Sequence, residues 1–159
     1  MSITIGDTVP DIGVFTNGQD GPEKLQTGAF FKGKRVVLFG VPGAFTPGCS
    51  NAHMPGFVVA ADKLKEKGVD EIACMAVNDA FVMDAWQKSQ NANDVVMLAD
   101  GNAELAKALG LDMDASGFGL GTRCKRFALI AEDGVVTYVG VDDKGVEKSA
   151  ADTILAQLG

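Results

Sequence analysis

The sequence predicts an α/β fold with a mixed central sheet and helices on both faces. Continuous apolar runs rich in β-branched residues, such as VVLFGVP (36–42), are typical of strands that are buried on both faces. Helical patterns separate these runs, and regular alternation of strand and helix indicates parallel strands. The last such stretch, 126–141, instead has the pattern of an antiparallel hairpin, which makes the predicted sheet mixed.

Each strand is indicated by its own pattern. After Val36 to Pro42, the runs EIACMAV (71–77) and VVMLAD (95–100) predict two further buried strands. In the hairpin of 126–141, the Glu-Asp-Gly sequence supplies the turn. The N-terminal stretch ITIGDTVPDIGVF (3–15) is expected to add a short hairpin at the sheet edge.

Four helices are expected between and after the strands: Ser50–Lys67, Ala80–Gln90, Ala103–Leu109 and Ala150–Leu158. Gly68 and Gly110 stand where glycines commonly end helices, because glycine adopts the left-handed conformation without strain. Pro55 falls inside the first helix, where it removes a backbone hydrogen bond. We therefore expect a kink near His53.

Length and charge limit the classes of function. The 159 residues, 47% of them hydrophobic, suit one compact domain spanning 1–159. The net charge of −7 argues against nucleic acid and anionic membranes as partners, since both would repel the protein. No apolar run approaches the roughly 20 residues that span a bilayer. The start MSITIGDTVPDIG lacks the pattern of a signal peptide, so we expect a cytoplasmic protein.

The sequence favours neither a disulfide framework nor a metal site. It has three cysteines, an odd number, and disulfides are rare in a reducing compartment. Its one histidine, His53, lies four residues after Cys49 on the same predicted helix face. Two ligands do not make a zinc site. We expect no metal and no cofactor.

Cys49 stands where a helix follows a strand and a short loop. Pro47 suits the first helical position and Thr46 suits the N-cap, which puts Cys49 in the first turn. Unpaired N–H groups and the helix dipole favour an anion there. Thiols in such settings have pKa values of roughly 3.5–7.5, against about 8.5 for a free cysteine. The position predicts a thiolate nucleophile.

The loop before Cys49 is rich in glycine, with Gly40, Gly43 and Gly48. Glycine lets backbone amides approach a small ligand, and the Thr46 hydroxyl can hydrogen-bond beside the sulfur. A thiolate among aimed donors suits attack on a small polar electrophile. The alternative is an inert buried cysteine at a helix start. The Gly-Pro-Thr composition of the loop favours a functional residue.

The segment PGAFTPGCSNAHMPGF (42–57) resembles the active-site segment of peroxiredoxins of the type-five and plant type-II branch. Their P-x-x-x-T-x-x-C pattern is matched by Pro42, Thr46 and Cys49. The resemblance extends through CMAVNDAFVMDAW, LADGNAELAKALGL and GFGLGTRCKRFALIAEDGVV, from about residue 6 to 140. It implies a thioredoxin-like fold. It also implies reduction of hydrogen peroxide and organic hydroperoxides through a sulfenic acid on Cys49.

The resemblance also implies an arginine at the site, and on the motif this is Arg126. From the sequence, Arg126 opens an otherwise apolar strand, where a buried charge needs an anionic partner such as the thiolate. An arginine that merely reaches solvent from a strand end is the alternative, and Arg123 is the competitor, expected to be structural. The expected catalytic residues are Cys49, Thr46 and Arg126. The expected substrate-binding residues are Pro42, Gly48 and His53, with His53 as a supporting residue rather than a base.

This sequence departs from the family pattern in the residues that would reduce the Cys49 sulfenic acid back to a thiol. Some relatives use a cysteine near the C-terminus, where this chain has GVEKSAADTI (145–154). Cys74 is expected to be inert in the core. Cys124 is the better internal candidate for a resolving thiol. If the chain is already extended before Arg126, Cys124 lies on the same strand face as Arg126, and we then expect it to be too far from Cys49 for a disulfide. We expect a one-cysteine mechanism with glutathione or glutaredoxin as reductant, and thioredoxin second.

The quaternary state and two rival functions complete the expectations. Phe45 and Phe81 could be ordinary core residues. By the resemblance, their positions lie near a dimer interface and the mouth of the site, which implies a homodimer. A thiol–disulfide oxidoreductase on the same scaffold would want a cysteine at position 46, which is threonine. A peroxide sensor or holdase that works through the same thiol is the other rival. Sustained peroxide consumption with a thiol reductant separates the enzyme from both.

Overall fold

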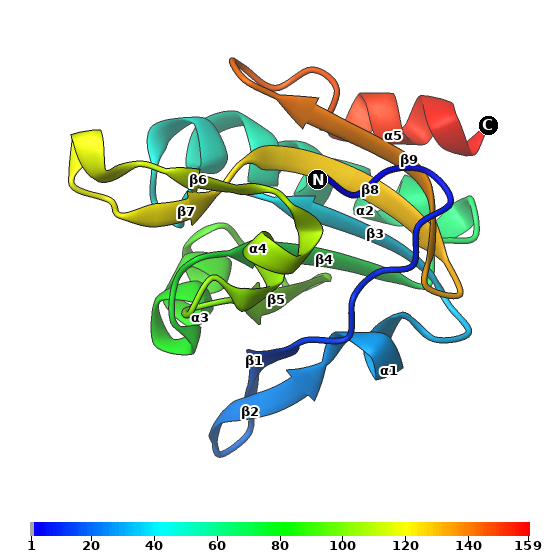
Figure 1. Ribbon diagram of the computed structural model, residues 1–159. Helices are drawn as coiled ribbons and strands as arrows, with labels where there is room; N and C mark the ends of the chain where they lie inside the picture. Colours follow the sequence, from blue (N-terminus) through cyan, green and yellow to red (C-terminus); the bar gives the residue numbers. More distant parts are fainter. Residues whose placement is uncertain (1) are drawn as a thin grey trace.

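The structure, a computed structural model, describes residues 2–159, except for the side chain of Cys49. Within them, a seven-stranded sheet has the order β2-β1-β5-β4-β3-β8-β9, and helices pack on both of its faces (Figure 1). The strands β3, β4 and β5 are parallel, whereas β8 runs antiparallel to β3 and β9 antiparallel to β8. The predicted α/β class with a mixed sheet is confirmed.

The strands of the main sheet are β1 (Gly13–Gly18), β2 (Gly21–Gln26), β3 (Arg35–Gly40), β4 (Glu71–Ala76), β5 (Val95–Ala99), β8 (Arg126–Glu132) and β9 (Val135–Asp142). A separate two-stranded sheet holds β6 (Asp112–Asp114) and β7 (Thr122–Cys124). The predicted hairpin of 126–141 is confirmed as β8 and β9. Its turn residues Asp133 and Gly134 have φ of 51° and 79°, as a tight two-residue hairpin turn requires.

The helical elements are α1 (Thr27–Phe31), η1 (Cys49–His53), α2 (Met54–Glu66), α3 (Ala80–Ser89), α4 (Glu104–Leu109), η2 (Ser116–Phe118) and α5 (Ala151–Leu158). The predicted helices after residues 80, 103 and 150 are confirmed to within one residue at each end. Asp79 caps α3 by accepting a hydrogen bond of 2.8 Å from the Val82 amide. Gly110 ends α4 with φ of 70°, as the sequence predicts.

Two apolar layers sandwich the sheet. Helices α2, α3 and α5 cover one face, here called the α2 face, and α1 and α4 cover the other, here called the α4 face. Strand β4 shows why the central runs are apolar throughout. Its Ile72 and Cys74 side chains belong to the α2 face, while Ala73 and Met75 belong to the α4 face. The predicted burial of Cys74 in the core is confirmed.

The predicted N-terminal hairpin over residues 3–15 is wrong. The edge hairpin is instead β1–β2, ten residues further along, and the strand pairing of residues 2–12 is a single bridge from Thr8 to Val135 in β9. The sequence NGQDG supplies the turn between Gly18 and Gly21, where Gly21 has φ of 114°. Turn-forming residues at that position, rather than the apolar pattern upstream, determine which segment folds back.

The helix predicted for 50–67 is divided. Helical geometry begins at Pro47, widens into the π-type turn η1, and becomes the α-helix α2 at Met54. Pro55 is the second residue of α2, and its missing N–H falls where the π-type turn changes into the α-helix. The expected irregularity near His53 is present, as a change of helix type at that residue.

Candidate active site

The loop between β3 and η1 lies at the carboxyl edge of the parallel strands. Ala44 donates its amide to the Asn78 side chain at 2.9 Å, so the residue that follows β4 holds this loop. Thr46 turns back on Gly43, with its amide at 3.3 Å and its hydroxyl at 2.6 Å from the Gly43 carbonyl. Phe45 is exposed and has φ of 65°, a costly conformation for a bulky residue. The loop is therefore held in one shape by specific bonds.

Cys49 begins η1, directly after the first helical residues Pro47 and Gly48. The Ser50 amide bonds the Thr46 carbonyl at 2.9 Å, which closes the first helical turn around Cys49. The predicted position of Cys49 in the first turn is confirmed for the backbone. Its side chain lies outside the described residues, so its ionisation and contacts stay predictions.

The Thr46 hydroxyl has a defined direction. Because its proton is donated to the Gly43 carbonyl, the oxygen is left to act as an acceptor toward other groups. Such an acceptor can receive a thiol S–H or the O–H of a hydroperoxide. The position of Thr46, three residues before Cys49 and half-buried in the turn, suits either role.

Arg126 reaches from the start of β8 to the Cys49 turn. Its guanidinium lies against Gly48, where an added Cβ would stand only 2.9 Å from Nη2. Its Nη1 lies 3.1 Å from Nδ1 of His53. The fold therefore brings the predicted arginine to the residue immediately before Cys49. Any side chain at position 48 would push the guanidinium away.

His53 is neutral and held at both ring nitrogens. Arginine can only donate, so Nδ1 accepts from Arg126, and Nε2 carries the proton and donates to the Ser149 carbonyl at 2.9 Å. His53 is 1% exposed, and this burial, with a smaller contribution from the charge of Arg126, lowers its pKa from 6.5 to about 4. A histidine so bound can orient Arg126, but its bonds leave it no basic nitrogen for a thiol.

Ser149 and Asp142, which the sequence did not indicate, complete the bonds behind His53. Asp142 ends β9 opposite Arg126 in the ladder, and its carboxylate accepts from the amides of Glu147, Lys148 and Ser149 at 2.9–3.0 Å and from the Ser149 hydroxyl at 2.6 Å. Burial alone would raise the pKa of Asp142, but these bonds together hold it below its usual value. No motif marks either residue, because the bonds depend on how the 142–149 loop closes.

Arg123 supports the loop backbone from another side. Its Nη1 donates to the Pro42 carbonyl at 3.3 Å, and its Nε donates to the Leu120 carbonyl at 3.0 Å. An added Cβ at Gly43 would stand 2.6 Å from Nη1. Gly43 and Gly48 are thus small because each faces a guanidinium at close range.

Cys124 is buried, and its thiol donates to the Val41 carbonyl at 3.1 Å. The condition for a strand face shared with Arg126, an unbroken extended chain up to Arg126, is not met. Cys124 and Phe127 both belong to the α4 face, whereas Arg126 alternates with Phe127 and points to the α2 face. The alternation breaks at Lys125, which bonds Leu111 at 2.7 Å where the chain passes from β7 into β8.

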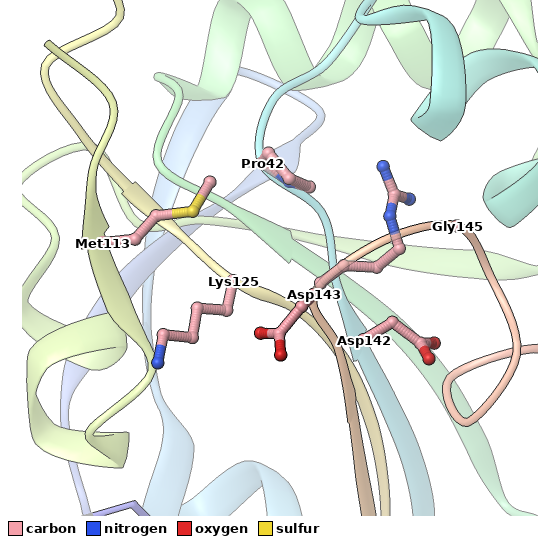
Figure 2. Close-up of a pocket in the computed structure, with 7 residues that line it drawn as sticks. Pro42, Met113, Lys125, Asp142, Asp143 and Gly145 are labelled. Carbon is pink, nitrogen blue, oxygen red and sulfur yellow. The ribbon is translucent and has the colours of Figure 1, made fainter. Parts of the chain in front are cut away.

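A cavity of about 250 Å³ lies beside the site (Figure 2). It is lined by Pro42, Met113, Lys125, Arg126, Asp142, Asp143 and Gly145. Of the predicted site residues, Pro42 and Arg126 line this cavity, and His53 lines a second one, of about 190 Å³, near α5. Among the described residues, no group of three or more His, Cys, Asp or Glu is placed to hold a metal ion, and no helix is long and apolar enough to cross a membrane.

Comparison with known proteins identifies the family. The sequence profile of the Redoxin family matches residues 4–155. The chain is 49% identical over 160 residues to peroxiredoxin-2C of Oryza sativa subsp. japonica, covering 98% of both chains. It is 48% identical over 163 residues to peroxiredoxin-2B of Arabidopsis thaliana, again covering 98% of both.

Solved structures agree with this assignment. Reduced Prx3 of Vibrio vulnificus, solved in complex with hydrogen peroxide, matches with a TM-score of 0.95 and 52% identity over 99% of both chains. Peroxiredoxin 5 of Alvinella pompejana matches with a TM-score of 0.87 and 34% identity, over 98% of this chain and 97% of that one. These neighbours confirm the thioredoxin-like fold and the resemblance to the type-five and plant type-II branch. The chain belongs to the Redoxin family as a peroxiredoxin, and it is a thiol peroxidase oxidoreductase.

Proposed function

We propose that Cys49 is the peroxide-reducing nucleophile, with Arg126 and Thr46 completing the catalytic set. One observation carries this proposal: the Arg126 guanidinium packs against Gly48, at the helix start that holds Cys49. A thiolate in that turn has the helix N-terminus on one side and a guanidinium held by His53 nearby. Both favour the reactive anion.

The reaction is a two-electron transfer from sulfur to peroxide. The Cys49 thiolate attacks the terminal oxygen of a hydroperoxide, the S–O bond forms and the O–O bond breaks. The sulfur becomes a sulfenic acid, and the departing alkoxide or hydroxide takes a proton to leave as alcohol or water. Arg126 stabilises negative charge on sulfur and then on the departing oxygen, while Thr46 accepts a hydrogen bond from the peroxide.

The remaining predicted residues would shape the approach to the sulfur. Pro42, whose carbonyl is bound by Arg123, forms one wall. Gly48 leaves space for the guanidinium, and His53 holds Arg126 from behind. Hydrogen peroxide and organic hydroperoxides are the proposed substrates. The Vibrio vulnificus protein, named as a complex with hydrogen peroxide, supports the first of these.

The sulfenic acid is reduced by an external thiol in this proposal. Cys74 and Cys124 are both buried, and the Cys124 thiol lies on the α4 face, bonded to Val41. A first external thiol condenses with the sulfenic acid, releasing water and forming a mixed disulfide. A second external thiol then attacks the external sulfur of the mixed disulfide. The Cys49 thiolate is released, and the two external thiols leave joined as a disulfide. We favour glutathione or glutaredoxin as the reductant, with thioredoxin second.

Three variants test this cycle. Cys74→Ser with Cys124→Ser should turn over peroxide at near the wild-type rate when glutathione and glutaredoxin are supplied, and Cys49→Ser should not turn over at all. Parallel assays with thioredoxin rank the reductants. If Cys124→Ser alone keeps the first oxidation but stops turnover, Cys124 is the resolving thiol and the one-cysteine cycle is wrong. Oxidation without sustained turnover by any thiol system would favour a peroxide sensor.

A homodimer is also part of the proposal. Phe45 and Phe81 are 54% and 71% exposed, so both side chains are accessible to a second copy of the chain. Burial of both against a second copy would cover them, with Phe45 at the rim of the active-site loop. Sedimentation equilibrium of wild type against Phe81→Asp tests this, and a monomeric wild type would exclude it. A cytoplasmic location stays a prediction.

A further inference from the structure

We propose that Asp142 is a positioning residue for Arg126, acting through Ser149 and His53. The inference rests on the proposed role of Arg126 in the peroxide reaction. It extends the site by a loop, residues 142–149, that follows the last strand and that no sequence motif marks. In each bond of the series, the chemistry of the two groups fixes which one donates and which one accepts.

The first link is the closure of the loop by the Asp142 carboxylate. One oxygen accepts from the amides of Glu147 and Ser149 at 3.0 and 2.9 Å and from the Ser149 hydroxyl at 2.6 Å; the other accepts from the Lys148 amide at 3.0 Å. These bonds fix the Ser149 backbone, and Ser149 is fully buried. Without the carboxylate, three backbone amides lose their acceptor together, so the Ser149 backbone is held less firmly. The bonds of Tyr138 to the Lys148 carbonyl and of Thr153 to the Glu147 carbonyl remain.

The second link is the Ser149 carbonyl, which accepts from Nε2 of His53 at 2.9 Å. A carbonyl can only accept, so this bond holds the proton on Nε2. Nδ1 is then the ring nitrogen with a lone pair, and it accepts from Arg126 at 3.1 Å. Moving the Ser149 carbonyl would release the ring and allow the other tautomer, which cannot accept from a guanidinium.

The third link is the placement of the guanidinium itself. Arg126 and Asp142 are opposite each other in the β8–β9 ladder, but the carboxylate is directed at residues 147–149. Figure 2 shows the carboxylates of Asp142 and Asp143 pointing in different directions from adjacent positions. Asp142 therefore acts on Arg126 through the loop and His53, while Asp143 is exposed and takes no part in these bonds.

Asp142→Ala tests the proposal, with Asp143→Ala as the matched control that removes the same charge one residue away. The measured quantity is the rate constant for oxidation of reduced Cys49 by hydrogen peroxide in a single turnover, which needs no reductant. Trp86, the single tryptophan, donates to the Ser50 hydroxyl at 3.0 Å, so its fluorescence reports events next to Cys49. We expect Asp142→Ala to slow the oxidation about tenfold, because Arg126 is kept but loses its alignment. Asp143→Ala should react at the wild-type rate.

A double variant distinguishes positioning from a general structural defect. In an Arg126→Ala background there is no guanidinium to place, so adding Asp142→Ala should change the rate by less than about twofold. The thiol pKa of Cys49, measured by alkylation, should rise in Asp142→Ala and not rise further in the double variant. A full tenfold loss in the Arg126→Ala background would overturn the proposal.

Folding is controlled separately. Thermal unfolding is recorded for each variant, and rates are compared well below the transition. If Asp142→Ala does not fold, Asp142→Asn serves instead. Its amide keeps one oxygen for the Ser149 bonds and loses the acceptor for Lys148, so a loss of about threefold is expected and an unchanged rate overturns the proposal. If Arg126→Ala reacts as wild type, the proposed catalytic role of Arg126 fails. If Arg126→Ala is slow and Asp142→Ala is not, only the positioning role fails.

Discussion

Lowering the pH from 7 to 4 should destabilise the protein through His53. The histidine has its pKa lowered from 6.5 to about 4 in the folded state, chiefly by burial. Below pH 6.5, His53 is protonated in the unfolded chain, whereas in the folded protein it stays neutral until the pH approaches 4. Stability from the neutral ring is therefore full above the unfolded pKa and is lost as the pH falls toward the folded pKa.

The magnitude follows from the size of the shift. At about 1.4 kcal/mol per pKa unit, the difference between 6.5 and about 4 is worth about 3 kcal/mol of unfolding free energy. His53 is 1% exposed, so solvent does not screen this contribution appreciably. Most of the loss of stability should occur between about pH 6 and 4.5, because this range lies between the pKa of 6.5 in the unfolded chain and that of about 4 in the folded protein. The loss should level off below the folded pKa.

The assay is urea unfolding followed by Trp86 fluorescence at a series of pH values, with His53→Gln as the matched variant. The glutamine amide can still donate to the Ser149 carbonyl but does not titrate. Subtracting the two pH profiles removes the contributions of Asp100, whose pKa is raised chiefly by burial, and of Asp142, whose pKa is lowered. Parallel loss of stability in wild type and His53→Gln between pH 7 and 4.5 would refute the reasoning.

Four substitutions at the catalytic turn give further predictions. Cys49→Ser should abolish peroxide consumption with an unchanged circular dichroism spectrum; residual turnover would contradict its role. Arg126→Ala should slow the single-turnover oxidation by about a hundredfold and raise the Cys49 thiol pKa, as measured by alkylation rate against pH. Gly48→Ala should slow it about tenfold with little loss of stability, since a Cβ there stands 2.9 Å from the Arg126 guanidinium; a wild-type rate would show that the guanidinium need not lie there. Thr46→Val should slow oxidation about tenfold or more by removing the acceptor while keeping the shape, and an equal rate would assign the hydroxyl to holding Gly43 alone.

Much of the fold was predictable because its signals are local. The runs that became β3, β4 and β5 are apolar on both faces, since helices cover both sides of the central sheet. The start of α3 at Asp79 and the end of α4 at Gly110 agree with their capping residues. The N-terminal hairpin was misplaced because residues 3–15 and 13–26 both have strand-like patterns. The turn residues between Gly18 and Gly21 determine which segment folds back, and its strand β1 then pairs with β5 in the sheet.

The chemistry of the site was predictable in part for the same reason. Cys49 at a helix start after Thr46 and Pro47 is a property of consecutive residues, so the sequence indicated it without tertiary information. The face of Cys124 was not predictable in this way. Strand alternation fails at Lys125, where the chain passes from the small sheet into the large one, and no local pattern marks that change.

By itself, the sequence determined the element order, the buried strands and the position of Cys49 at the helix start, because each depends on neighbouring residues and on the period of one element. The tertiary structure alone decided which groups gather at that turn. Arg126 meets His53 across 73 residues, and His53 meets the Ser149 carbonyl across 96. Such contacts depend on strand pairing and on the path of the 142–149 loop. Their geometry arises from the packing of distant segments, which leaves no periodic signal in the chain.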